Sequence, residues 1–198
     1  MNTAARRPGG AFGELLAAAL LLGLSGCGGG SEAGEEGALS ADADPPDREW
    51  TAGVVDRPTK ATGPVLVRRV EAGRHPGFDR MVWEFAGDSL PGLHVEYVDE
   101  PVRACGSGRV VPLPGDGWLR IAFQPARGHS PEGRATVPDS LVPALPVIRK
   151  MVRTCDFEAV HGWTAGVVSP EPFRVLSLRD PTRIAVDVRH PDARGEAP

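Results

Sequence analysis

Residues 179–188 read Arg179-Asp180-Pro181-Thr182-Arg183-Ile184-Ala185-Val186-Asp187-Val188. Asp180-Pro181 predicts a tight turn, because proline restricts φ and favours an extended conformation in the residue before it. After the turn, apolar and polar residues alternate, as they do on a strand with one face in a core. The predicted core face consists of Ile184, Val186 and Val188, and the opposite face consists of Arg183, Ala185 and Asp187.

A similar phrase occurs once more upstream, at Asp79-Arg80-Met81-Val82-Trp83-Glu84-Phe85. Its apolar row is Met81, Trp83 and Phe85, while Arg80 and Glu84 take the places of Arg183 and Asp187. Both segments therefore predict strands that carry the pattern Arg-x-x-x-acid and have one buried face.

The composition favours short strands joined by tight turns. The 198 residues are 41% hydrophobic, which supports a core, but 25 glycines and 20 prolines argue against long helices. Residues 141–152 are ambiguous, because their apolar pattern suits a helix that Pro143 and Pro146 would interrupt, and we interpret residues 147–154 as a strand. The other strand candidates are residues 65–71, 94–98, 109–113, 118–123, 157–168 and 173–178; residues 73–77 read as a turn and 124–138 as a long surface loop. These elements predict an all-β fold, an antiparallel β-sandwich of two small sheets.

The N-terminus has the features of an export signal. Arg6-Arg7 supplies positive charge, residues 15–24 form an apolar run too short to span a bilayer, and Leu24-Ser25-Gly26-Cys27 follows. The last four residues resemble the bacterial lipobox, so we expect residues 1–26 to be a lipoprotein signal peptide and Cys27 to receive a lipid. The alternative is a signal cut elsewhere, with Cys27 an ordinary thiol.

The rest of the chain divides by composition. Residues 27–49 are rich in Gly, Ala, Asp, Glu and Pro, so we expect a flexible acidic linker that holds the domain clear of the membrane. A folded domain is predicted over residues 50–192, followed by a disordered tail at 193–198. The localisation expected from this layout is the extracytoplasmic face of the cell membrane.

Two cysteines are left once Cys27 is assigned to the lipid. In an oxidising compartment Cys105 and Cys155 are expected to form a disulfide that closes a loop of about fifty residues. The alternative makes Cys105 a nucleophile, but no histidine accompanies it in a recognisable signature.

A hexapeptide occurs twice, because Trp163-Thr164-Ala165-Gly166-Val167-Val168 repeats residues 50–55 letter for letter. Each copy is followed by an apolar strand candidate and then by an Arg-x-x-x-acid strand. One explanation is a duplicated half-domain that supplies equivalent strands to a pseudo-symmetric sandwich. The other is coincidence in a sequence rich in Val, Gly and Ala.

Leu178 to Val188 resembles the ending L-x-x-P-x-R-hydrophobic-x-hydrophobic-D of AMIN domains, which occur in some cell-wall amidases and in pilus secretins. With residues 75–85, and Asp156-Phe157-Glu158 ahead of Trp163, the chain resembles the AMIN-like domain of bacterial lipoproteins over residues 65–190. The resemblance implies a β-sandwich of two similar sheets, a place in the cell envelope and association with peptidoglycan. The sequence shows no amidase or secretin domain after it, so we expect the module to act alone.

The candidate binding surface combines Arg80, Glu84, His94, Glu96, Arg183 and Asp187. The two Arg-x-x-x-acid strands would line a polar groove for glycan or peptide stems, or else form cross-strand ion pairs on solvated faces. If residues 80–99 form a hairpin, Glu84 would face Glu96 with His94 nearby, and such a group suits acid/base chemistry or a metal. Trp83, Trp118 and Trp163 are expected in the core, and an exposed tryptophan would suit stacking on a sugar.

The sequence carries no catalytic, metal-binding or phosphate-binding motif, so we expect neither a cofactor nor a metal. A formal net charge of −4 gives no basic field for a nucleic acid. Three hypotheses follow: a lipid-anchored, non-catalytic module that binds peptidoglycan or an envelope protein; a structural lipoprotein that recruits a protein partner through a sheet edge; and a hydrolase that uses Glu84, Glu96 and His94. The first is preferred.

Overall fold

The structure is a computed structural model that describes residues 49–191. The predicted signal peptide, the lipidation site at Cys27, the linker up to residue 48 and the tail at 193–198 lie outside the described residues. No helix among residues 49–191 has the length and apolar character that a membrane crossing needs.

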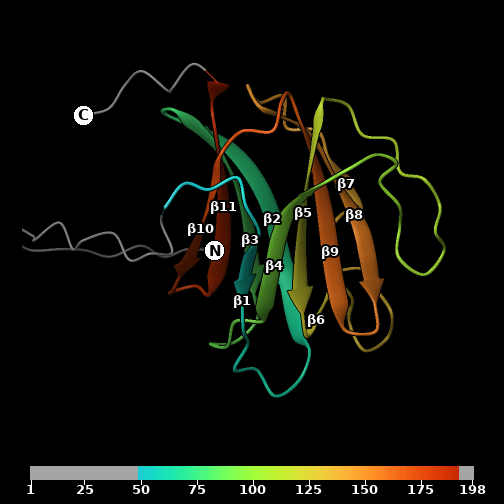
Figure 1. Cartoon of the computed structure of the whole chain (residues 1–198). Helices are drawn as coiled ribbons and strands as arrows, with labels where there is room; N and C mark the ends of the chain where they lie inside the picture. The colour runs from blue at the N-terminus through green and yellow to red at the C-terminus, as the bar shows by residue number, and fades with distance from the viewer. Residues whose placement is uncertain (1–48, 192–198) are drawn as a thin grey trace, which may run out of the picture. The chain divides into compact units, whose positions relative to one another are not determined.

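The described residues form two sheets, which confirms the predicted all-β sandwich (Figure 1). The six-stranded sheet has the order β1 (Val55–Arg57), β4 (Gly92–Val98), β5 (Gly117–Gln124), β9 (Val160–Val167), β8 (Ile148–Phe157) and β7 (Ser140–Leu141). The five-stranded sheet has the order β10 (Phe173–Leu178), β11 (Arg183–Arg189), β3 (Phe78–Phe85), β2 (Val65–His75) and β6 (Ala126–Arg127). The pairing of β2 with β6 is parallel, whereas the other strand pairs are antiparallel.

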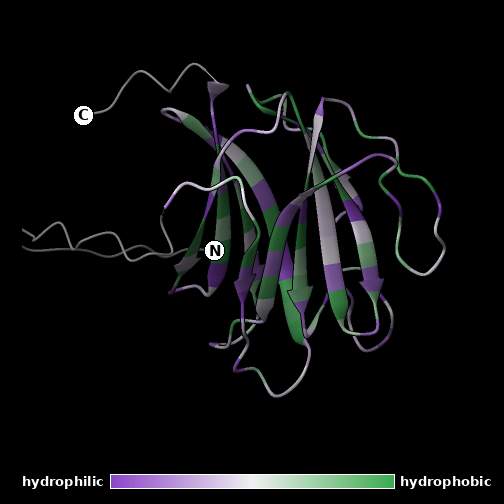
Figure 2. Ribbon diagram, viewed as in Figure 1, coloured by the Kyte–Doolittle hydropathy of each residue, from purple (hydrophilic) through white to green (hydrophobic). Residues whose placement is uncertain are grey.

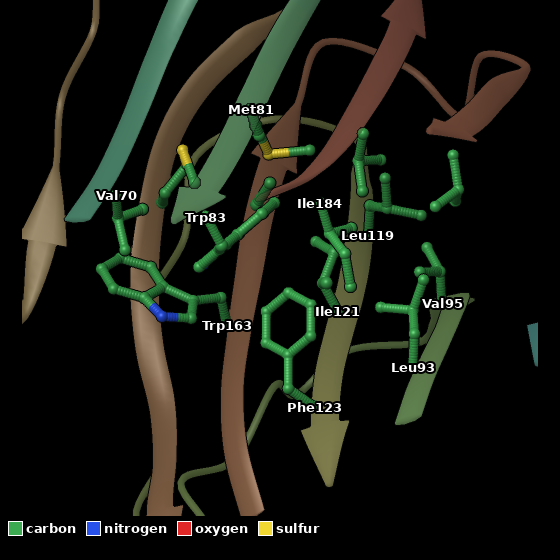
Figure 3. Packing of buried hydrophobic residues seen from close by; sticks show 14 of the residues in the cluster. Val70, Met81, Trp83, Leu93, Val95, Leu119, Ile121, Phe123, Trp163 and Ile184 are labelled. Carbon is green, nitrogen blue, oxygen red and sulfur yellow. The ribbon is translucent and has the colours of Figure 1, made fainter. Parts of the chain in front are cut away.

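Both sheets contribute one face to a common hydrophobic core, and the alternation appears as green and purple bands along the strands in Figure 2. Trp83 of β3 lies 5.3 Å from Phe123 of β5 and 6.5 Å from Trp163 of β9, measured between ring centroids. Figure 3 shows Trp163 and Phe123 packed with Ile184 and Met81 in this core. Trp83 and Trp163 are fully buried, as expected for core tryptophans. Trp118, also expected in the core, is half-buried and lies outside it.

A buried acid also connects the two sheets. Asp79 of β3 is fully buried, and its Oδ2 accepts hydrogen bonds from the backbone N–H groups of Val147 at 2.7 Å and Ile148 at 3.1 Å. Its Oδ1 lies 2.9 Å from Nε2 of His190. Because a buried carboxylate is costly without partners, these bonds hold the start of β8 against β3.

The two Arg-x-x-x-acid strands, β3 and β11, are neighbours in the five-stranded sheet. They pair antiparallel with Arg80 opposite Asp187 and Glu84 opposite Arg183. The arginine of each strand thus lies opposite the acidic residue of the other strand.

Several local predictions were wrong. Asp180 has φ 55°, in the left-handed region and not extended, although the turn before β11 is present. Residues 73–75 belong to β2, and the turn is confined to Pro76 and Gly77, whose φ of 77° suits glycine. Residues 109–113 form no strand: Val110 makes an isolated bridge with Arg103, and Val111 and Leu113 pack against Trp118 as part of a loop.

The two copies of the hexapeptide do not occupy equivalent places. Trp163 to Val167 lies in β9, between β5 and β8. The copy at 50–55 precedes and enters the short edge strand β1, and Thr51 forms an isolated bridge with Phe173 of the other sheet. The two copies therefore do not form the equivalent strands that a duplicated half-domain would supply.

The loop at residues 99–116 covers part of the six-stranded sheet. Val102, Val111 and Leu113 form a second small cluster with Trp118 and Val152. Cys105 and Cys155 are paired, with their sulfur atoms 2.10 Å apart, and this pairing attaches the loop to β8.

We predict that the full-length protein, unfolded by urea, loses about 4 kcal/mol of stability in a Cys105→Ser/Cys155→Ser double variant, since the bond closes a 50-residue separation. Thiol titration of the native protein should find no reactive thiol at these two positions. Two reactive thiols in the folded wild type would contradict the pairing.

Candidate functional site

The outer face of the five-stranded sheet brings arginines and aromatic rings together. Strand register places Arg174 of β10, Asp187 of β11, Arg80 of β3 and Gly73 of β2 in one row. The next row contains Arg189, Phe78 and His75. We call the following residues the arginine–aromatic cluster: Trp50, His75, Phe78, Arg80, Arg174, Asp187 and Arg189.

Asp187 lies at the centre of this cluster and is fully buried. Arg80 donates from Nε to Oδ1 at 2.6 Å and from a terminal nitrogen to Oδ2 at 2.9 Å, while Arg174 donates from Nε to Oδ2 at 2.8 Å. The hydrogen bonds to Asp187 raise the pKa of Arg80 above its ordinary value. The expectation that Asp187 would lie on an exposed surface is therefore wrong: it acts as an anchor beneath the surface, because two arginines cover it.

The aromatic rings of the cluster lie against the guanidinium groups. The Trp50 ring has Arg174 at 4.6 Å and Arg189 at 4.5 Å from its centroid, within the range of cation–π contacts. Phe78 has Arg174 at 5.0 Å and stacks on His75 with ring centroids 4.9 Å apart. The half-buried Trp50 and Phe78 thus present ring surface next to positive charge.

The cluster carries more positive than negative charge. It contains three guanidinium groups and one carboxylate, a formal excess of about two charges when histidine is neutral. Beside Arg80 the surface is hollowed at a shallow depression lined by Glu71, Ala72, Gly73, His75, Arg80 and Val82. A side chain at Gly73 would meet nothing within 4 Å, so this position opposite Arg80 is open.

Glu84 and Arg183 lie on the same outer face, nearer the other end of β3 and β11. They are opposite each other in register, but Arg183 donates from Nε to the carbonyl oxygen of Pro181 at 3.3 Å. Of the two arginine–acid pairs that the register of β3 and β11 places opposite each other, Arg80 with Asp187 forms an ion pair among the described residues and Glu84 with Arg183 does not.

His94 and Glu96 belong to the other sheet, which corrects the predicted hairpin of residues 80–99. After β3 the chain crosses to β4 in the six-stranded sheet, so Glu84 does not face Glu96. His94 Nδ1 lies 2.6 Å from Oδ1 of Asp56, and this hydrogen bond raises the pKa of His94. Glu96 pairs with Arg120. His94 Nε2 lies 3.2 Å from Glu96, so these two residues do come together, but Glu84 lies on the other sheet. The predicted three-member hydrolase cluster is therefore not assembled.

A second polar cluster escaped the sequence analysis. Asp156 accepts hydrogen bonds from the Gly128 N–H at 2.8 Å and from Arg153 at 2.7 Å, and it lies 2.9 Å from His129 Nδ1. Burial alone would raise the pKa of Asp156, but hydrogen bonds from His129, Gly128 and His161 lower it. The residues come from a loop and from β8 and β9, so no spacing in the sequence pointed to them.

His161 gives this second cluster a structural character. It is fully buried, and Trp163 Nε1 donates to its Nε2 at 2.8 Å. Burial lowers the pKa of His161, which keeps the ring neutral with its proton on Nδ1, 3.3 Å from Asp156. A neutral, enclosed imidazole that accepts a hydrogen bond from a core tryptophan has a structural role. No group of three metal-ligand side chains is found within residues 49–191.

We predict that Asp187→Asn lowers the free energy of unfolding by about 3 kcal/mol, because two arginines lose their buried counter-charge. Glu84→Gln, a matched change on the same sheet face, should cost less than about 0.5 kcal/mol. Urea unfolding of both full-length variants provides the measurement, and equal losses would show that Asp187 is not the anchor.

The AMIN-like domain family matches residues 65–190, which covers β2 to β11. No curated protein and no solved structure gave a match. Domains of this family are in general non-catalytic binding domains associated with peptidoglycan and envelope interactions, and they indicate an extracytoplasmic protein. The family match extends over most of the described residues and agrees with the sandwich fold, so this chain belongs to the AMIN-like domain family.

Proposed function

We propose that this protein is a lipid-anchored, non-catalytic module that associates with peptidoglycan on the extracytoplasmic side of a bacterial membrane. The family supports the envelope role and the absence of a reaction. We take the arginine–aromatic cluster as the binding face. Its aromatic rings lie beside excess positive charge, and this combination suits a polymer of sugars and acidic peptides.

The anchor is proposed from the N-terminal sequence. Residues 1–26 would be removed as a signal peptide, Cys27 would carry the lipid, and residues 27–49 would form the tether to a domain at 50–192, with 193–198 as a tail. The paired Cys105 and Cys155 support an oxidising compartment.

We predict that mass spectrometry of the mature protein from membranes finds its N-terminus at Cys27 with the mass of a lipid on that residue. Cys27→Ser should abolish the modification and release the protein from the membrane fraction. An unmodified thiol at residue 27 would refute the anchor.

A partner that adds a strand to the sheet edge is the alternative. At one edge of the five-stranded sheet this alternative has less support, because Arg57 already occupies part of β10. It donates to the carbonyl oxygen of Val175 at 2.8 Å and to Ser177 Oγ at 3.0 Å, and the bridge between Thr51 and Phe173 covers the start of the strand. Edges blunted in this way resist strand addition.

We predict that the full-length protein in detergent is retained on purified peptidoglycan, and that salt weakens the retention because charged groups carry it. Arg174→Gln/Arg189→Gln should reduce retention about tenfold or more, since each charge-assisted hydrogen bond contributes roughly 1.5 kcal/mol. The matched control is Arg149→Gln, an exposed arginine of the six-stranded sheet. Retention no better than that of heat-denatured protein would reject peptidoglycan binding.

A further inference from the structure

The arginines of the cluster differ in how much of their hydrogen-bonding capacity is used. Arg80 directs two nitrogen atoms at Asp187, whereas Arg174 directs only Nε at it. The Arg189 guanidinium lies over the Trp50 ring, and no carboxylate within residues 49–191 forms an ion pair with it. Arginine has five N–H donors, so Arg174 and Arg189 keep donors available beside the same indole.

These donors suit a carboxylate. Guanidinium groups bind carboxylates through paired, charge-assisted hydrogen bonds, and the cluster already holds one carboxylate, Asp187, between Arg80 and Arg174. Since Asp187 neutralises only one of the three arginines, a second carboxylate would complete the charge balance without displacing the first. A neutral sugar would leave the excess charge uncompensated.

We propose that Arg174 and Arg189 bind a free carboxylate of a peptidoglycan stem peptide, and that the ring of Trp50 contacts the adjoining apolar part. The open position at Gly73 gives the polymer room to continue across the sheet beside Arg80. This inference rests on the proposed association with peptidoglycan and names the chemical group that is recognised.

Trp50 completes this site. It lies ahead of the stretch that matches the family, residues 65–190, and reaches the sheet because Thr51 bridges to Phe173 at the start of β10. The backbone bonds between Thr51 and Phe173, at 2.8 and 2.7 Å, fix its neighbour Trp50 beside Arg174.

The test compares retention of the full-length protein in detergent on three forms of peptidoglycan. The first is untreated, the second has its free carboxylates converted to amides, and the third has been stripped of phosphate polymers with hydrofluoric acid. We expect amidation to weaken retention at least tenfold and acid stripping to leave it unchanged, since the lost interactions are charge-assisted hydrogen bonds.

Two variants localise the effect. Arg189→Gln should bind untreated peptidoglycan about tenfold more weakly and respond less to amidation than the wild type, because the missing charge and the missing carboxylate belong to one contact. Arg149→Gln should behave as the wild type. Because Arg189 contributes no ion pair to the fold, its loss should leave urea unfolding almost unchanged, which separates binding from folding.

Each other outcome overturns the inference in a distinguishable way. Equal retention on amidated and untreated polymer would reject carboxylate recognition while leaving peptidoglycan association in place. Loss of retention only after acid stripping would assign binding to phosphate polymers. No retention on any form would reject the proposed function and this inference together.

Discussion

The pairing of β3 with β11 is the contact on which the rest of the five-stranded sheet depends. It places Arg80 directly opposite Asp187, and β10 adds Arg174 from the other side. A fully buried carboxylate held by two arginines tolerates little displacement, because a shift of register would leave its charge without donors. The ion pair therefore fixes the register of three adjacent strands, and that register in turn brings the aromatic rings of the outer face together.

Strand β3 itself carries another buried aspartate, Asp79, on the face opposite to Arg80. Asp79 points into the sandwich and binds the backbone at Val147 and Ile148, whereas Arg80 points outward to Asp187. Neighbouring residues of one strand thus attach it to the other sheet and to its own sheet. Each buried carboxylate must keep its hydrogen-bond donors, so neither attachment allows the strands to shift far. These two attachments help to fix how the two sheets lie against each other in the described residues, which contain no helix.

The candidate site combines these structural charges with groups that are not fully used by the fold. Asp187 is satisfied and buried, so it supports the surface and does not bind a ligand itself. Arg174 and Arg189, with Trp50, lie above it and supply donors and ring surface. By contrast, His161 and Asp156 form hydrogen bonds within the fold, and His94 and Glu96 lie on the other sheet.

The sequence by itself determined the all-β class, most of the strands and the core-facing residues of β11, because alternation with a period of two separates the two faces of a strand. It also identified Arg80 and Asp187 as members of matched strands. It did not show that Ala185 and Asp187, on the opposite face of β11, are buried as well. Only the tertiary structure decided that these strands are neighbours, that Asp187 is buried, and that β4 belongs to the other sheet, which separates Glu84 from His94 and Glu96. The sequence did not identify Trp50, Arg174 and Arg189 as candidate binding residues, because they come from three separate segments that meet only after the sheet forms. Alternation along one strand does not tell which other strand will lie beside it.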